Sequence, residues 1–247
     1  IVIADTNNHR VVQKDNVVEE GSGTTAGPGG NGAGSNVDQL HDPVDMFITA
    51  AGTSYILDMT NVRVLKFPPG ASSGIVVAGG NGKGDALTQL QDPLGLAVDS
   101  AERVYIADTG NHRVVAWAKD ATEGVLVAGF GGKGDGMNQL RRPADVAINA
   151  RGQLFVSDGG NDRVMRYEPQ ASYGTWTTQY LNVGAGLLSS PRGLVLTETD
   201  TVVLADSGNH RVVELYNTFG AGYFISLRML AGGAGEGSAL AQLAFPC

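Results

Sequence analysis

Carboxylate, amide, guanidinium and imidazole groups recur together along this chain, and such groups could bind a metal ion or transfer protons. They form the pattern Asp-x-x-Asn-x-Arg-Val, whose five copies begin at Asp5, Asp58, Asp108, Asp158 and Asp206. The copies are 53, 50, 50 and 48 residues apart. A catalytic centre needs its residues once, whereas architecture needs the same device in every repeat. The recurrence therefore predicts a structural turn, in which aspartate accepts backbone N–H groups and arginine bridges to aspartate or to a carbonyl.

The residues assigned to this structural turn are Asp5, Arg10, Asp58, Arg63, Asp108, Asn111, Arg113, Asp158, Asn161, Arg163, Asp206, Asn209 and Arg211. Three copies place a histidine directly before the arginine, at His9, His112 and His210. Equivalent positions in alternate repeats lie far apart, whereas metal ligands must lie within about 2.0–2.2 Å of one ion. We therefore expect partly exposed turn histidines here, and no metal site formed by them.

A second pattern, Gln-Leu-x-x-Pro, keeps the same period. It begins at Gln39, Gln89, Gln139 and Gln242, with a degenerate copy at Leu187. Each repeat also contains four short runs rich in Val, Ile and Ala and bounded by Gly, Asn and Asp, for example 94–98, 103–107, 113–117 and 125–128. Four such runs in about 50 residues, without helical periodicity, predict the four-stranded antiparallel blades of an all-β propeller.

The triplet inside the repeated turn resembles that of the NHL-repeat family, which is named for an Asn-His-Leu-like sequence. Here it reads Asn-His-Arg in three copies, Asn-Val-Arg in the second and Asn-Asp-Arg in the fourth. The resemblance covers essentially the whole chain and implies a β-propeller, usually of six blades. It does not imply one activity, because the fold carries binding modules and enzymes alike.

We expect a single NHL-type propeller over residues 1–247, with about five blades visible. The expected blades are approximately 1–30, which is incomplete, 43–80, 93–130, 143–184 and 191–233. Pro43, Pro93, Pro143 and Pro191 each precede an inner-strand sequence, but Pro246 is followed only by Cys247. The first blade lacks its inner strand, so we expect the chain to be part of a longer polypeptide. A five-bladed ring with an open seam is the alternative.

Strands of a meander alternate in direction, so the repeated turns and the glycine-rich loops between blades lie at one end of the sheets. We call this end the top face. Its expected charged or titratable loop residues are Lys83, Asp85, Lys133, Asp135, His112 and His210. Loops 79–85 and 129–135 contain Gly-Lys but lack the Ser or Thr and the spacing of a phosphate-binding loop. We expect their glycines to supply positive φ, with weak calcium binding through the two loop aspartates as the alternative.

The most informative departure from the repeat lies two residues after the proline, where the inner strand begins at the channel mouth. Gly95 and Gly193 occupy this position in two blades, and Asp45 and Asp145 occupy it in two others. Carboxylates there could hold a cationic group or a calcium ion, with Arg192 as a counter-charge. Alternatively, the aspartates accept neighbouring backbone N–H groups. These two aspartates and Arg192 are the candidate binding residues, and no residue is assigned a catalytic role.

Composition narrows the classes of partner. The chain has 17 Lys and Arg against 25 Asp and Glu, for a formal net charge of −8. This disfavours nucleic acid as a partner, although Lys133, Arg141 and Arg142 could form a local basic patch. The single cysteine excludes internal disulfides and cysteine-based zinc sites. The sequence contains no apolar run of about 18 residues, the length that would span a membrane. The acidic, glycine-rich composition slightly favours secretion.

These features favour a non-catalytic interaction scaffold, without a cofactor, that presents a propeller face to a protein or glycan partner. The repeats are nearly alike, and no nucleophile–base set converges in the sequence. The alternative is a metal-dependent lyase or lactonase-like hydrolase at the channel mouth, because similar propellers include peptidyl-hydroxyglycine amidating lyases and calcium-dependent lactonases. Two carboxylates are too few for calcium, which takes about 6–8 oxygen ligands, unless the missing inner strand supplies more.

Overall fold

The computed structural model describes residues 2–13, 25–26, 31–169, 176–181, 187–217 and 225–232. Within these residues the strands form five antiparallel sheets, of which the first has three strands and the others have four. The four-stranded sheets are simple meanders in which consecutive strands pair. The expected all-β fold of four-stranded antiparallel blades is therefore confirmed.

The first sheet contains β1 (Val2–Asp5), β2 (Arg10–Gln13) and β3 (Thr25–Ala26). The second contains β4 (Pro43–Ile48), β5 (Ser54–Asp58), β6 (Arg63–Phe67) and β7 (Ile75–Gly79). The third contains β8 (Gly95–Val98), β9 (Val104–Asp108), β10 (Arg113–Trp117) and β11 (Val125–Ala128). The fourth contains β12 (Pro143–Ile148), β13 (Leu154–Asp158), β14 (Arg163–Pro169) and β15 (Trp176–Leu181). The fifth contains β16 (Pro191–Leu196), β17 (Val202–Asp206), β18 (Arg211–Asn217) and β19 (Ile225–Gly232).

Short 3-10 turns join β1 to β2 in the first sheet, and the second strand to the third strand in the third, fourth and fifth sheets. The described ones are η1 (Thr6–Asn8), η2 (Thr109–Asn111), η3 (Gly159–Asn161) and η4 (Ser207–Asn209). Across the described part of the chain, no helix is long and apolar enough to cross a membrane.

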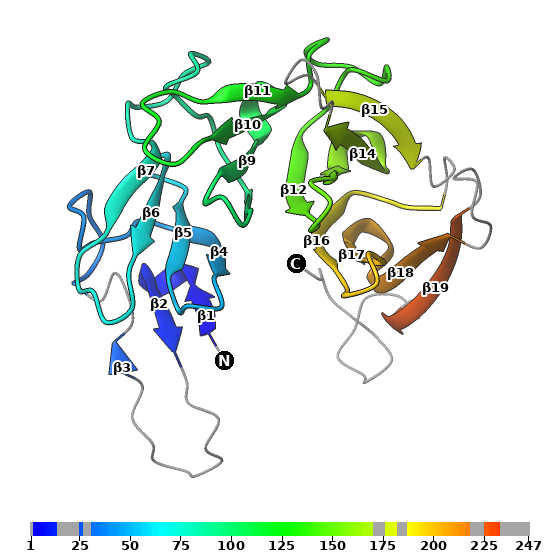
Figure 1. Cartoon of the computed structure of the whole chain (residues 1–247). Coiled ribbons are helices and arrows are strands. Elements are labelled where there is room, and N and C mark those ends of the chain that lie inside the picture. The colour runs from blue at the N-terminus through cyan, green and yellow to red at the C-terminus, as the bar shows by residue number, and fades with distance from the viewer. Residues whose placement is uncertain are drawn as a thin grey trace.

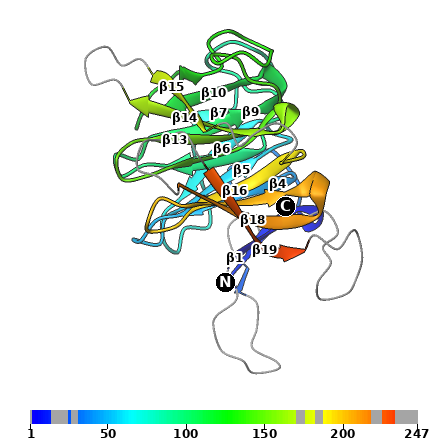
Figure 2. The ribbon, with the colours of Figure 1, turned by 90° about the vertical axis from the view of Figure 1, so that its right-hand side faces the viewer.

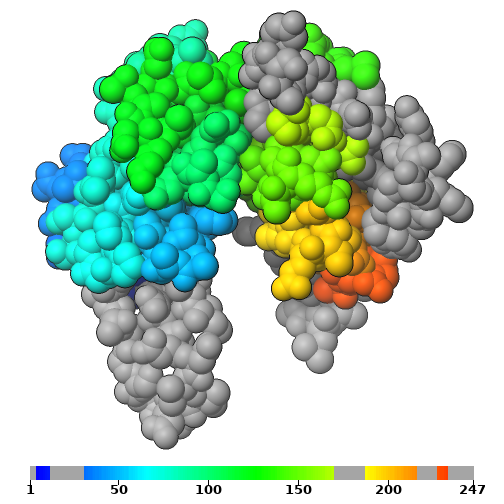
Figure 3. Space-filling view, in the orientation of Figure 1, coloured from blue at the N-terminus to red at the C-terminus, as the bar shows by residue number. Residues whose placement is uncertain are grey.

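The five sheets stand side by side around an arc (Figure 1). Their inner strands β1, β4, β8, β12 and β16 contact one another in that order. A perpendicular view shows the sheets stacked one on another (Figure 2). In the space-filling view the molecule is hollowed at the centre of the arc, between the second and fifth sheets (Figure 3). The starts of the inner strands therefore converge from different sheets on a common axis.

Apolar cores lie between neighbouring sheets. In β9, Tyr105 contributes to the core shared with the fourth sheet, and Ile106 contributes to the core shared with the second sheet. Because both faces of a blade are buried, its strands are almost continuous apolar runs rather than alternating ones. Phe67, Trp117 and Tyr167 occupy the fifth position of the third strand in three blades and are almost completely buried in these cores. Packing between blades thus holds the sheets around the axis.

Some sequence expectations concern residues outside the described part. The expected first blade is described only at residues 2–13 and 25–26. The last copy of the second pattern, residues 242–246, and Cys247 lie outside the described residues.

Candidate functional site

The repeated turn is organised by its aspartate. In the fourth sheet, Asn161 Nδ2 and Arg163 Nε each donate to Asp158 Oδ2 at 2.7 Å, and Asp158 Oδ1 accepts the backbone N–H of Arg141 at 2.7 Å. Asp158 is fully buried. Burial raises the pKa of its carboxyl, and the hydrogen bonds from Arg141, Asn161 and Arg163 oppose this. The same three contacts recur at Asp58, Asp108 and Asp206.

The arginine of the turn also holds the glycine-rich loop. Arg163 Nη1 donates to the Asp135 carbonyl at 2.7 Å, and Nη2 donates to the carbonyls of Gly136 and Gln139, both at 2.9 Å. Arg63 and Arg113 make the corresponding contacts in the preceding repeats. The polar groups of the turn are thus occupied in joining it to the loop.

The residue after the turn asparagine adopts a left-handed conformation and links one blade to the next. His112, with φ of 57°, accepts the backbone N–H of Arg142 on Nδ1 at 3.0 Å. Asp162, with φ of 55°, accepts the backbone N–H of Ser190 on Oδ1 at 2.7 Å. His210 has φ of 50° at the equivalent position of the fifth sheet. Histidine and aspartate serve alike here because each offers an acceptor at that distance from the backbone.

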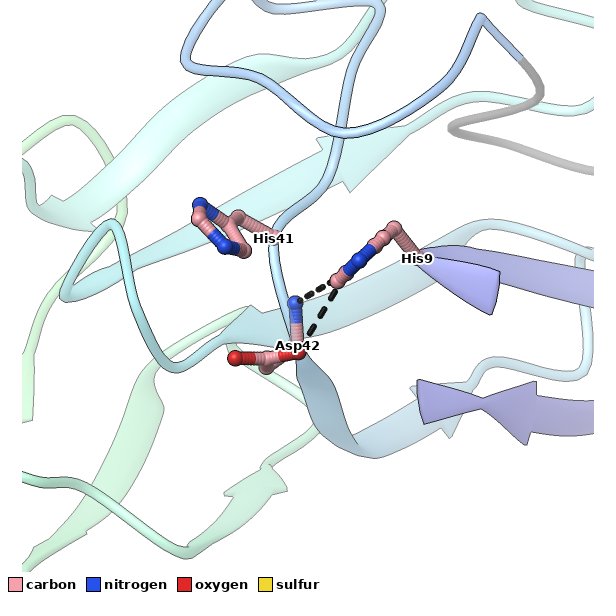
Figure 4. Close-up of side chains that lie close together, drawn as sticks. All are labelled: His9, His41 and Asp42. Carbon is pink, nitrogen blue, oxygen red and sulfur yellow. Dashed lines mark hydrogen bonds and ion pairs between the residues drawn. The ribbon is translucent and has the colours of Figure 1, made fainter. Parts of the chain in front are cut away.

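A group of potential metal ligands that the sequence reasoning missed lies between the first two sheets. His9 comes from the turn after η1, and His41 and Asp42 come from the loop that enters β4 (Figure 4). The His9 and His41 rings meet edge-on with centroids 5.1 Å apart, and His9 Nδ1 lies 3.2 Å from Asp42 Oδ1. Among the described residues this is the one set of three His, Cys, Asp or Glu side chains whose ligand atoms converge.

Hydrogen bonds already occupy much of this group. His9 Nδ1 accepts the backbone N–H of Asp42 at 3.2 Å, and Asp42 Oδ2 accepts the Thr60 hydroxyl at 2.9 Å. Two imidazoles and a carboxylate are the ligand types of a zinc site with an open position. The signal in the sequence was a histidine that occupies a different position within the repeat from that of His9. A comparison of equivalent repeat positions relates His9 only to histidines in distant blades.

The two channel-mouth aspartates follow irregularities at the starts of inner strands. The pairing of β4 with β5 shifts between Pro43 and Asp45, and that of β12 with β13 shifts between Pro143 and Asp145. A bulge changes the direction of the side chains next to it. It turns both carboxylates toward the neighbouring inner strand.

Each aspartate bonds to the next blade. Asp45 Oδ2 accepts the backbone N–H of Leu96 in β8 at 2.6 Å, and Asp145 Oδ2 accepts that of Leu194 in β16 at 2.7 Å. The other oxygen of each carboxylate accepts the N–H of the residue that follows it, at 2.7 Å. All four carboxylate oxygens therefore accept a backbone hydrogen bond.

The two carboxyl groups are close enough to influence each other. Burial raises the pKa of Asp45 to about 6, against the hydrogen bonds from Leu96 and Met46. Burial also raises the pKa of Asp145 well above its ordinary value, and the negative charge of Asp45 raises it further. The site is therefore a pair of carboxyl groups that resists carrying two negative charges.

These aspartates open onto a cavity of about 390 Å³, which we call the axial pocket. Its lining residues are Thr6, Val44, Asp45, Leu94, Ala144, Asp145, Arg192 and Gly193. They come from all five sheets. Thr6 donates its hydroxyl to the Pro43 carbonyl at 2.7 Å, whereas the exposed Arg192 side chain has no hydrogen bond or ion pair with any described residue.

The structure thus places Asp45, Asp145 and Arg192 on one pocket. Lys133 and His112 line a neighbouring pocket that shares Leu94 with the axial pocket. Lys83 donates to Asp92 at 2.7 Å. Asp85, Asp135 and His210 line neither of these two pockets, and the two loop aspartates contact the turn arginines through their carbonyls.

Comparison with known sequences identifies one kind of repeat. The NHL repeat matches residues 90–117 and 188–215. Each match covers a second-pattern leucine, the inner strand, the repeated turn and most of the third strand. No curated protein matches the chain in sequence.

Solved structures share the fold at low sequence identity. Virginiamycin B lyase from Staphylococcus aureus is 11% identical with a TM-score of 0.54, over 81% of this chain and 61% of that one. A gluconolactonase from Xanthomonas campestris is 16% identical with a TM-score of 0.53, over 74% and 60% of the two chains. An auxiliary nutrient binding protein from Bacteroides ovatus is 14% identical with a TM-score of 0.53, over 78% and 48%. The chain spans about half to three fifths of the length of these structures.

Proposed function

Since this chain is an NHL-repeat protein with β-propeller blades, we propose that it is a non-catalytic recognition module whose top face binds a protein or glycan partner. The partner contacts the axial pocket, and Arg192 provides the charged contact. The similar structures include two enzymes and a nutrient binding protein. The proposal therefore rests on the residues of this chain and not on fold likeness.

The observation that carries the proposal is the engagement of both carboxylates. Every oxygen of Asp45 and Asp145 accepts a backbone N–H, and one bond of each aspartate crosses to the next inner strand. Groups that hold strands together are poorly placed to move during a reaction. Arg192, by contrast, is exposed at the same pocket. A guanidinium that pairs with no residue in the described part of the chain offers planar donors to a partner's carboxylate, hydroxyl or carbonyl groups.

The axial pocket also has the dimensions of a recognition site. Its volume of about 390 Å³ lies within the range of small-ligand pockets. Val44 and Leu94 supply apolar walls beside the charged groups. Such a pocket accepts a sugar ring or one side chain of a partner protein.

A charge reversal tests this function. The Arg192→Glu variant is compared with Arg151→Glu, which removes an arginine that is 75% exposed in the turn between β12 and β13. Binding is measured by capture of proteins from an extract of the source cells and by an oligosaccharide array. We expect the wild type and Arg151→Glu to retain a common partner that Arg192→Glu loses. Equal binding by both variants, or capture of nothing by the wild type, contradicts the proposal.

The raised pKa values favour one second candidate, a lyase or lactonase-like hydrolase in the axial pocket. A carboxyl group that is still protonated near neutral pH can donate a proton, and its ionised neighbour can accept one. The residues present do not fit calcium, because the pocket has two carboxylates and each of their oxygens already accepts an N–H.

An activity assay separates the two functions. Sugar lactones and cyclic ester substrates are incubated with the wild type and with Asp145→Asn, with and without added calcium. The recognition proposal predicts no turnover above that of the variant. Turnover by the wild type that Asp145→Asn abolishes would establish the enzymatic alternative.

A further inference from the structure

A second pocket on the top face is lined by uncompensated positive charge. It has a volume of about 430 Å³ and lies between the turn that follows β9 and the loop that enters β12. Its lining residues are Asp92, Leu94, Thr109, Gly110, His112, Lys133, Arg141 and Arg142. We call it the cationic pocket. Three of its side chains carry a full positive charge in a chain whose formal net charge is −8.

In the preceding repeat, the equivalent lysine is neutralised by an aspartate. Lys83 Nζ donates to Asp92 Oδ1 at 2.7 Å. Asp92 lies directly before the anchor proline and is left-handed, with φ of 45°. The equivalent residue one repeat later is Arg142, with φ of 51°, and the equivalent of Lys83 is Lys133. The fourth blade therefore has an arginine where the third has the counter-ion of its lysine.

Within the described residues, no acidic group pairs with Lys133 in place of that counter-ion. The side chains of Lys133, Arg141 and Arg142 are exposed. None of them forms an ion pair with any residue in the described ranges. Like charges gathered without a counter-ion repel one another, so the arrangement costs free energy until an anion binds.

The positive charges of this pocket act on the imidazole of His112. Burial lowers the pKa of its imidazole, the charges of Lys133, Arg142 and Arg141 lower it further, and the negative charge of Asp158 opposes them. Its Nδ1 accepts the backbone N–H of Arg142, so the neutral ring carries its proton on Nε2 as a further donor. The pocket thus gathers donors, and the one carboxylate that lines it, that of Asp92, is paired with Lys83 through its Oδ1.

We propose that the cationic pocket binds the phosphate or carboxylate group of a small ligand. Two arginines suit such groups because each guanidinium can donate two parallel hydrogen bonds to an oxyanion. The pocket has the volume of a small-molecule site. The negative charge of the whole chain favours a ligand with one compact anionic group over a long polyanion. This site does not depend on the axial pocket, since only Leu94 is shared.

Titration with inorganic phosphate and with malonate at low salt tests the proposal. Binding is followed by calorimetry in the wild type, in Arg142→Asp and in Arg151→Asp. Arg142→Asp restores the acidic residue of the preceding repeat beside Lys133, whereas Arg151→Asp makes the same change of charge far from the pocket. We expect Arg142→Asp to weaken binding about tenfold or more and Arg151→Asp to leave it nearly unchanged. Equal weakening in both variants would show only a general charge effect and would overturn the proposal.

A readout in the wild type keeps the test independent of the folding of the variants. The His112 ring resonance, assigned by its loss in His112→Gln, must move as either anion is added, and its pKa must rise because the anion offsets the neighbouring cations. A response to phosphate alone assigns the pocket to phosphate groups, and a response to malonate alone assigns it to carboxylate groups. The absence of any response to both anions at millimolar concentration overturns the proposal.

Discussion

Asp145 occupies the space that a side chain on Gly95 would need. A Cβ atom built on Gly95 would lie 2.4 Å from Asp145 Oδ1 and 2.5 Å from its Cα. The two residues belong to neighbouring inner strands, β8 and β12. Glycine at position 95 therefore allows the backbone of β12, with the Asp145 carboxylate, to approach β8 closely, and the two departures from the repeat form a single contact beside the axial pocket.

This relationship predicts the effect of Gly95→Ala. The Cβ would contact backbone atoms as well as a side chain, so relief requires the inner strands to move apart. We expect the free energy of unfolding to fall by roughly 1–3 kcal/mol, as for other overpacked sites. Chemical denaturation measures this value. Gly136→Ala is the control, because its Cβ would approach only the flexible Gln139 side chain; an equal loss in the two variants contradicts the packing argument.

The buried turn pairs are expected to dominate stability. Removal of Asp158 leaves Arg163, which is 8% exposed, without its carboxylate, and leaves the Arg141 N–H without its acceptor. Breaking a buried pair in this way costs about 3–5 kcal/mol. Urea denaturation of Asp158→Ala should show a loss of this size. The Arg10 side chain of the first turn is 49% exposed, so Arg10→Ala should have a much smaller effect; the reverse order would refute this assignment.

The carboxyl pair predicts a dependence of stability on pH. The pKa of Asp45 is raised from 3.8 to about 6, and that of Asp145 is raised in the same direction. A raised carboxyl pKa means that the folded state holds its proton more tightly than the unfolded state. The stabilisation is complete below about pH 3.8 and is lost as the pH rises through about 6.

The Asp145→Asn variant distinguishes the titration of this pair from that of the other acidic groups. The free energy of unfolding is measured from pH 4 to pH 8 for the wild type and the variant. We expect the decline above about pH 4 to be shallower in the variant, because one of the two coupled groups no longer ionises. Parallel curves would show that the pair does not titrate in this range.

For the titration of His112 we expect the opposite dependence, in which the free energy of unfolding rises with pH. Its pKa is lowered from 6.5 by burial and by the nearby cations. The unfolded state therefore binds the proton first, and the stability that is present above about pH 6.5 declines as the pH falls below it. His112→Asn keeps an acceptor for the Arg142 N–H, in the manner of Asp162, and tolerates the left-handed backbone. Its unfolding free energy should lack this decline, and an unchanged decline would exclude His112 as its source.

The sequence predicted the features that repeat. Two patterns with one period were sufficient to predict NHL-type blades and four-stranded sheets, and both predictions are confirmed. Departures from the repeat also led to Asp45, Asp145 and Arg192, which the structure places on one pocket. Their role in binding stays a prediction.

Contacts between different repeat positions were not predictable in the same way. His41 meets His9 only because the loop before β4 passes the turn of the preceding sheet. The sequence indicated Arg141 and Arg142 as basic residues of one patch. The lack of a counter-ion at Lys133 becomes evident only by comparison with the preceding repeat, in which Lys83 pairs with Asp92. Such side-chain encounters depend on the path of the loops, which repeat spacing does not specify.

Hydrogen–deuterium exchange with a captured partner tests the central claim most directly. We expect the bound partner to slow exchange at the top face, at residues 92–96, 109–112, 141–146 and 192–194. The opposite turns, at residues 99–103, 149–153 and 197–201, should exchange as in the free protein. Protection confined to those opposite turns would contradict recognition through the axial pocket.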